Sequence, residues 1–192
     1  MTAARTIAVW PSEVTAPFDD LYDALDSLLP EHHLDAFDDL DGLPDVLSER
    51  SPEAVVLVID PGSVTSIGDR TIATVLATLG DHPDVSIAVI AGDGYLGTDG
   101  VTDASCLLGA MAVSGVRSLA LRRHRPGRSN VFCVPQSAYD TSTSLRGPIA
   151  QPTETVDVAN ALAFLLDETG RYVSGDVLYV NGGRHLFSSH TA

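Results

Sequence analysis

Short continuous apolar runs alternate along this chain with segments in which apolar residues recur every three or four positions. The continuous runs are rich in Val and Ile, which is typical of strands that are buried on both faces of a parallel sheet. The recurring pattern predicts amphipathic helices between them. The predicted strands are 6–10, 33–37, 54–60, 85–91, 129–134 and 177–180, and the predicted helices are 18–29, 43–50, 64–79, 103–123 and 153–168.

The strict alternation of strand and helix predicts an α/β protein. We expect a doubly wound parallel sheet of about six strands with helices on both faces, the Rossmann-like arrangement. Residues 135–152 are rich in Pro, Ser and Thr and form the longest irregular stretch. The length of 192 residues predicts a single domain over 1–192.

Composition narrows the classes of partner. A net charge of −15 argues against nucleic acid and anionic membrane surfaces as partners. No apolar run is long enough to span a membrane, and residues 1–10 do not resemble a signal peptide. We therefore expect a cytoplasmic protein. Cys106 and Cys133 alone suggest neither a disulfide framework nor a metal site.

All eleven basic side chains are arginines, so the 192 residues contain no lysine. A catalytic or phosphate-binding lysine is therefore excluded. Five arginines fall within 117–128, a stretch without an acidic residue. Two interpretations remain open for this stretch: a solvated helix end, where cations suit the helix dipole, or a contact with an acidic partner.

The segment 153–183 resembles the C-terminal signature of the short-chain dehydrogenase/reductase (SDR) family. Phe164-Leu165-Leu166 is similar to the end of the family's last helix, Gly175 to its turn, and Asn181-Gly182-Gly183 to its closing motif after the strand at 177–180. Upstream, 109–120 resembles the family's long interface helix and 128–135 the strand that follows it. The resemblance is best over 54–183, with 1–53 as a degenerate N-terminal part and 184–192 as a tail. It implies an SDR-type fold.

The resemblance also implies where the catalytic Ser, Tyr and Lys of the family would stand. These positions read as Gly92, Ser105 and Gly109, so all three catalytic groups are replaced. The family's fourth active-site residue, an Asn in an earlier helix, has no counterpart, because the first Asn of this sequence is Asn130.

The cofactor loop of the family is also missing. In the family the first strand leads into a glycine-rich loop that approaches the pyrophosphate. Here Trp10 is followed by Pro-Ser-Glu-Val-Thr-Ala-Pro, and no glycine precedes Gly42. The stretch between the strands at 6–10 and 54–60 is also too short for the family's two strand–helix units, so one unit is lost or reduced. We expect this chain to bind no cofactor and no metal, with NAD(P) held by a partner subunit.

One loop could still carry chemistry. Asp93, Tyr95 and Asp103 follow the strand at 85–91, where ligands bind in open parallel sheets. Tyr95 and Asp103 could form an acid/base pair. The competing interpretation is a glycine-rich turn with Asp103 as a helix N-cap. Cys106, one turn into the following helix, is expected to be a small buried residue.

The helix predicted over 103–123 is apolar on two sides. One side is expected to face the sheet, and the family buries the other against a second subunit. The sheet side contains Gly109, Ala112, Val113, Val116 and Ala120. The expected interface contains Leu107, Met111, Ser114, Ser118 and Leu121.

These features predict a catalytically inactive SDR-like subunit. It would associate with a complete NAD(P)-dependent SDR in a hetero-oligomer and support it. The alternatives are an enzyme with altered, cofactor-independent chemistry in the remnant cleft, and a homo-oligomeric ligand-binding or regulatory module.

Overall fold

The structure of the protein is a computed structural model. It describes residues 5–10, 20–37, 40–59, 69–96, 103–123, 127–135, 148–149 and 151–186. The side chains of a few residues inside the elements, including Tyr95, Asp103 and Ser105, lie outside this description.

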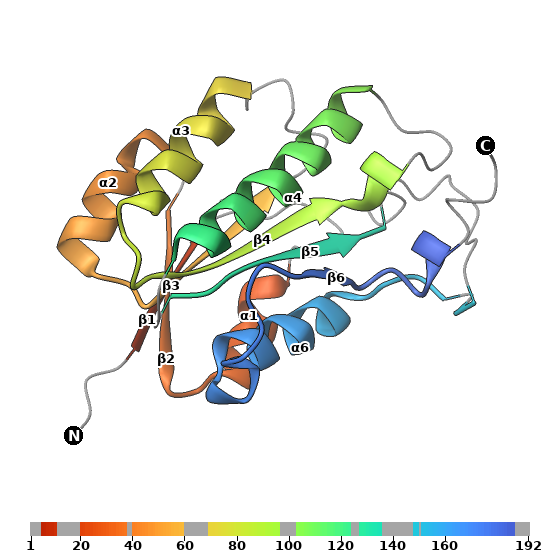
Figure 1. Ribbon diagram of the computed structural model, residues 1–192. Helices are drawn as coiled ribbons and strands as arrows, with labels where there is room; N and C mark the ends of the chain where they lie inside the picture. Colours follow the sequence, from red (N-terminus) through yellow and green to blue (C-terminus); the bar gives the residue numbers. More distant parts are fainter. Residues whose placement is uncertain are drawn as a thin grey trace.

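The described strands form one six-stranded sheet in the order β2-β1-β3-β4-β5-β6 (Figure 1). Every pair of neighbouring strands is parallel. The predicted doubly wound sheet is thereby confirmed. The strands are β1 (Arg5–Trp10), β2 (His32–Ala36), β3 (Ala54–Ile59), β4 (Ser86–Gly92), β5 (Ser129–Val134) and β6 (Val177–Tyr179).

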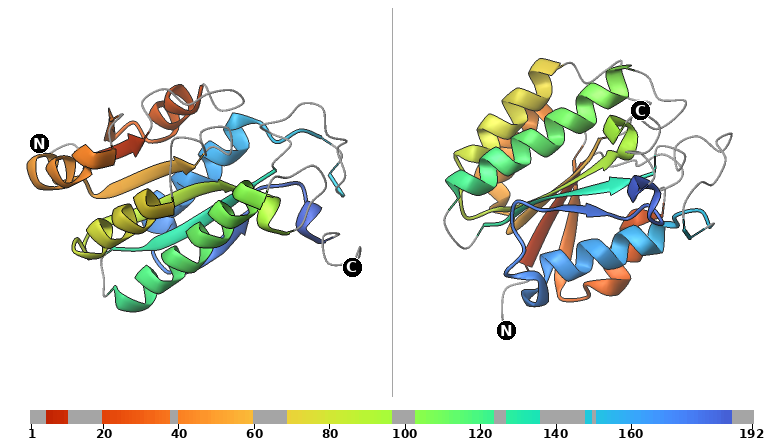
Figure 2. Two further views of the ribbon diagram at one scale, coloured as in Figure 1. Left: turned by 90° about the horizontal axis from the view of Figure 1, so that it is seen from above. Right: turned by 45° about the vertical axis from the view of Figure 1, so that its right-hand side comes forward.

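Helices cover both faces of the sheet (Figure 2). α1 (Leu21–Leu28) and α6 (Thr155–Leu166) pack on one face. α2 (Leu43–Asp45), α3 (Asp69–Gly80) and α4 (Asp103–Arg122) pack on the other. None of the helices in the described ranges is long and apolar enough to cross a membrane.

Alternation along each central strand explains how one sheet supports two cores. In β3, Val55 and Leu57 join the core beneath α3 and α4, whereas Val56 and Val58 join the core beneath α1 and α6. Because side chains alternate between the faces of a strand, a strand covered on both faces needs apolar residues at every position. The continuous apolar runs in the sequence are the consequence.

The region between β1 and β3 is short. Its described part contains α1, a single strand, β2, and then α2, which continues into a π-helical turn at Val46–Arg50. The predicted short helix over 43–50 is therefore an α turn followed by a π turn, which ends at Ser51 with a positive φ of 45°. In the described residues β2 lies beside β1 at the edge of the sheet, and the loss of a strand–helix unit stays a prediction.

Two arginines of the basic stretch hold helix ends inside the molecule. Arg123 donates to the carbonyls of Leu79 and Val85, which lie at the end of α3 and just before β4. Arg128 donates to the carbonyls of Leu166 and Asp167 at the end of α6, both at 3.2 Å. Terminal carbonyls of a helix lack intrahelical donors, and arginine supplies them. Both guanidinium groups therefore serve helix carbonyls, but Arg123 is buried, so the expectation of a solvated helix end is wrong for this residue.

Candidate functional site

The carboxyl end of β4 lies beside the start of α4. β4 ends at Gly92, a short 3-10 turn runs from Asp93 to Leu96, and α4 begins at Asp103. The Cys106 thiol donates to the carbonyl of Gly94 at 3.1 Å, which ties the first turns of the helix to the strand end. Parallel sheets commonly bind ligands at this edge, so it is the candidate site.

Asp93 lies at this edge and has no exposed surface. Its Oδ2 accepts a hydrogen bond from Nδ2 of Asn181 at 3.1 Å and lies 4.0 Å from Nε of Arg184. The Arg184 side chain is itself only 11% exposed. A buried carboxylate persists only when charge and hydrogen bonds compensate its lost hydration, and these partners supply that compensation.

Asn181 connects this carboxylate to the turn after β6. Its Oδ1 accepts from the backbone N–H of Gly183 at 3.2 Å and lies 2.9 Å from Nδ1 of His185. Because the amide oxygen only accepts, Nδ1 of His185 carries the proton. The His185 ring stacks on Tyr179, with centroids 4.2 Å apart and planes inclined by 18°.

The glycines of this motif are required by backbone geometry. Gly182 and Gly183 have positive φ values of 60° and 84°. A Cβ at Gly183 would lie 2.8 Å from Cδ of Pro148, so the turn also packs too closely for a side chain. The Asn-Gly-Gly sequence therefore builds a tight turn and fastens it to Asp93.

The positions expected to carry the family's catalytic groups gather at the same edge. Gly92 is the last residue of β4, and Ser105 and Gly109 lie in the first two turns of α4. Gly92 and Gly109 are buried and carry no functional group. Ser105 offers a hydroxyl at most, and its side chain lies outside the described residues.

The structure describes the side chain of one of the three expected cleft residues, Asp93, Tyr95 and Asp103. Asp93 is engaged in the network with Asn181 and Arg184. The side chains of Tyr95 and Asp103 lie outside the described residues, so the acid/base pair stays a prediction. The residues expected to replace the cofactor loop, 11–17, also lie outside the described ranges. No group of three or more His, Cys, Asp and Glu in the described part is placed to hold a metal ion.

The two sides of α4 differ in burial, with one exception on the outer side. On the sheet side Gly109, Ala112, Val113 and Val116 are buried, whereas Ala120 is half-buried. On the outer side Leu107 is 57% and Leu121 is 85% exposed, and Ser114 and Ser118 are exposed as well. The exception is Met111, which is half-buried and packs against the core beneath α3 and α4. Met111 thus also contributes to the fold, because α3 packs against this flank of α4.

In the sequence Asn181 is recognisable only as part of the closing motif, and no pattern assigns a role to Arg184, His185 or Tyr179. Their network joins residues 88 positions apart, from Asn181 to Asp93. The signal in the sequence was an Asn directly before two glycines. It predicts a turn, and nothing near it in the sequence identifies the carboxylate that it holds.

Comparison with known proteins gives partial sequence matches and extensive structural ones. No protein-family model matches the chain. A subunit of (2S)-[(R)-hydroxy(phenyl)methyl]succinyl-CoA dehydrogenase from Thauera aromatica is 35% identical over 114 residues, which are 53% of this chain and 45% of the relative. The chain thus matches a little under half the length of this curated relative.

Solved structures match over nearly the whole chain. An SDR-family oxidoreductase from Burkholderia thailandensis has a TM-score of 0.71 and 19% identity, over 95% of this chain and 93% of that one. The 3-alpha-hydroxysteroid dehydrogenase from Pseudomonas sp. B-0831 has a TM-score of 0.65 and 18% identity, over 97% and 100%. At this identity the likeness concerns the fold. The chain therefore has a Rossmann-like SDR fold and resembles the short-chain dehydrogenase/reductase family.

Proposed function

We propose that this chain is a non-catalytic subunit of an SDR-type dehydrogenase. It binds no NAD(P) itself and associates through the outer side of α4 with a complete SDR subunit, which holds the cofactor. The curated relative is named as a subunit of a dehydrogenase whose substrate is a CoA thioester. We extend this to the complex and propose an alcohol of a CoA thioester as its substrate.

The observation that carries the proposal is the absence of lysine. In the family the lysine lowers the pKa of the catalytic tyrosine and holds the ribose of the cofactor, and here its position reads as the buried Gly109. The 192 residues contain no lysine that could take over this role. Gly92 likewise has no hydroxyl to polarise a carbonyl group.

The exposed leucines of α4 support association. Leu107 and Leu121 are large apolar side chains that remain more than half exposed. The serines between them, Ser114 and Ser118, are small enough for another helix to approach closely. Burying these side chains against a partner would remove apolar surface from water.

Co-expression with the complete SDR encoded nearest to this chain's gene tests association. We expect the two chains to co-purify and native mass spectrometry to detect the mixed oligomer. Leu107→Glu should abolish co-purification, because it places an unpaired carboxylate in the interface. Leu28→Glu on α1, where the leucine is 38% exposed, is the matched control and should leave the complex intact.

Two results would overturn association. One is a monomer that ignores the complete SDR, and the other is equal sensitivity of the complex to both substitutions. A stable homodimer that loses its association on Leu107→Glu would favour the homo-oligomeric alternative. Circular dichroism of each variant must show a folded chain for the comparison to hold.

Titration with NADH and NADPH tests the loss of the cofactor site. We expect no saturable binding by the isolated chain in calorimetry. A dissociation constant in the micromolar range, equivalent to about −8 kcal/mol, would contradict the proposal.

A further inference from the structure

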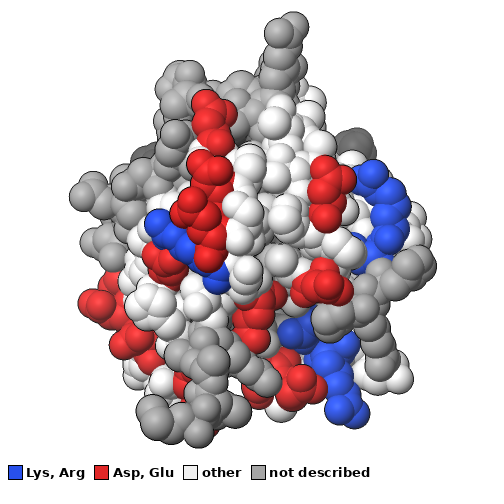
Figure 3. Space-filling model, turned by 90° about the vertical axis from the view of Figure 1, so that its left-hand side faces the viewer, with Lys and Arg blue, Asp and Glu red and all other residues white. Residues whose placement is uncertain are grey.

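The amino end of the sheet, opposite to the candidate site, contains a hollow of about 730 Å³. Acidic side chains spread over this end of the molecule, whereas basic ones gather in a few patches (Figure 3). The hollow lies between the ends of α4 and α6 and the starts of the central strands. Its charged lining residues are Arg123, Arg128, Arg171, Glu53, Asp84 and Glu168.

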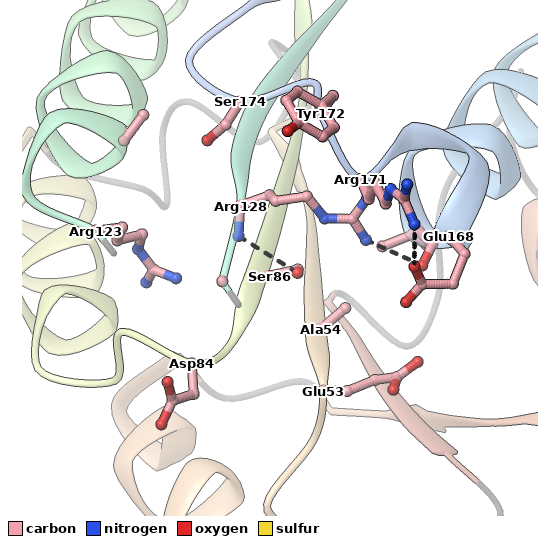
Figure 4. Close-up of a pocket in the computed structure, with 13 residues that line it drawn as sticks. Glu53, Ala54, Asp84, Ser86, Arg123, Arg128, Glu168, Arg171, Tyr172 and Ser174 are labelled. Carbon is pink, nitrogen blue, oxygen red and sulfur yellow. Dashed lines mark hydrogen bonds and ion pairs between the residues drawn. The ribbon is translucent and has the colours of Figure 1, made fainter. Parts of the chain in front are cut away.

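Three arginines reach the hollow from different segments (Figure 4). Arg123 follows α4, Arg128 precedes β5, and Arg171 follows the 3-10 turn Glu168–Gly170. Each guanidinium has five N–H donors, and the carbonyls capped by Arg123 and Arg128 use only some of them. The Nε of Arg123, whose side chain is buried, has no hydrogen-bond partner in the described structure.

The acidic residues do not all compete equally for these donors. Oε1 of Glu53 lies 2.7 Å from Nε2 of His32, so one of its carboxylate oxygens is already engaged, although its charge still acts on Arg128. Oε2 of Glu168 lies 3.9 Å from Nη1 of Arg171. The Glu168 side chain is 72% exposed and the Arg171 side chain is 68% exposed. Such a long, exposed pair is weak. Arg171 therefore retains donors that a stronger acceptor can take.

We propose that this hollow binds a small ligand through a carboxylate or phosphate oxyanion held between Arg128 and Arg171. The planar guanidinium matches the paired oxygens of both groups. Ser86 and Ser174 contribute hydroxyls to the same lining, and Tyr172, which is 80% exposed, flanks the hollow. The arginines and acids that line the hollow are equal in number, so recognition depends on directed N–H donors and not on net charge.

Calorimetric titration of the full chain with inorganic phosphate and, separately, with malonate tests this site. Sodium chloride at the same ionic strength is the reference titration, and the two arms show which oxyanion is preferred. We expect saturable binding of at least one anion. Arg171→Gln should weaken it about tenfold, the loss expected for a charge-assisted hydrogen bond.

Glu168→Gln provides the opposite result. Because it removes the competing carboxylate while preserving the size of the side chain, it should tighten binding about threefold. Arg117→Gln on the exposed surface of α4 and Glu49→Gln near β3 are the controls with the same charge changes, and should leave the affinity unchanged. Absence of saturable binding by the folded wild-type chain would overturn the proposal. Equal effects of the site and control variants would also overturn it, because they would indicate nonspecific charge attraction.

Discussion

The two ends of the sheet differ in how their charged side chains are partnered. At the carboxyl end the carboxylate of Asp93 is fully enclosed, and Asn181 and Arg184 compensate its charge. At the amino end the arginines lie along an open hollow, and some of their N–H groups donate hydrogen bonds to helix carbonyls. In the described part of the carboxyl end the buried charge is thus satisfied within the protein, whereas the amino end keeps donors that can meet a ligand.

Removing the enclosed carboxylate should have the largest effect on stability. Asp93→Ala removes the carboxylate that lies beside the largely buried Arg184 and accepts from Asn181. We expect the free energy of unfolding to fall by about 3 kcal/mol in urea denaturation. Asp93→Asn keeps the shape of the side chain and part of the hydrogen bonding. Its free energy of unfolding should therefore lie between those of the wild type and Asp93→Ala. A loss by Asp93→Ala of less than about 1 kcal/mol would show that the network does not close this end.

The capping arginine at the amino end should contribute less. Arg123→Met keeps the apolar stem but removes the donors to the carbonyls of Leu79 and Val85. We expect a loss of about 2 kcal/mol by the same measurement. The neighbouring Arg122 is exposed, and Arg122→Met should change the free energy of unfolding by no more than about 0.5 kcal/mol. Equal losses by the two variants would contradict the capping role.

A backbone substitution at the carboxyl end should cost slightly less again. Gly183→Ala places a Cβ at a positive φ of 84° and against the Pro148 ring. We expect a loss of about 1–2 kcal/mol, measured by thermal unfolding. Gly80→Ala at the end of α3 is the control, because its Cβ would meet Leu119 at an ordinary distance of 3.4 Å. That control should be neutral or slightly stabilising.

The smallest effect is expected from an exposed carboxylate near the hollow. The backbone N–H of Glu168 lowers the pKa of Asp167, burial opposes this shift, and Thr169 adds to it. A carboxylate with a lowered pKa stabilises the fold at neutral pH, and this contribution is lost as the pH falls below about 4. Asp167→Asn should therefore be slightly less stable than wild type at neutral pH and equal to it in acid. Denaturant midpoints measured across this range test the sign, and a difference that grows in acid would contradict it.

Sequence patterns predict this fold well where burial is complete. The runs that became β3, β4 and β5 are buried at nearly every position, so their apolar pattern is continuous. The region 43–50 was less predictable, because the same spacing suits an α-helix and the π turn that replaces most of it. Met111 shows a different limit of sequence patterns. A helical wheel predicts on which side of α4 its side chain lies, but only the structure shows that this side is partly covered by the neighbouring core.

The candidate site was predictable only in its losses. Lysine is missing whatever the fold, and the glycines at 92 and 109 can be identified from the resemblance. The Asp93–Asn181–Arg184 network could not be predicted, because each member is an ordinary turn residue in its own local sequence. The same holds for the hollow, which forms only when the ends of α4 and α6 meet the strands.

The bond between Asp93 and Asn181 also constrains the order in which the chain can fold. It closes a loop of 88 residues, and the entropy lost on closing a loop grows with its length. During synthesis the earlier strands can pair while Asp93 still lacks both Asn181 and Arg184. Until residues 181–184 leave the ribosome, the Asp93 carboxylate therefore stays hydrated, and it becomes enclosed only afterwards. The closure of the carboxyl end is thus a late folding event, which pulse-labelled hydrogen exchange should detect as delayed protection of the turn at residues 181–186.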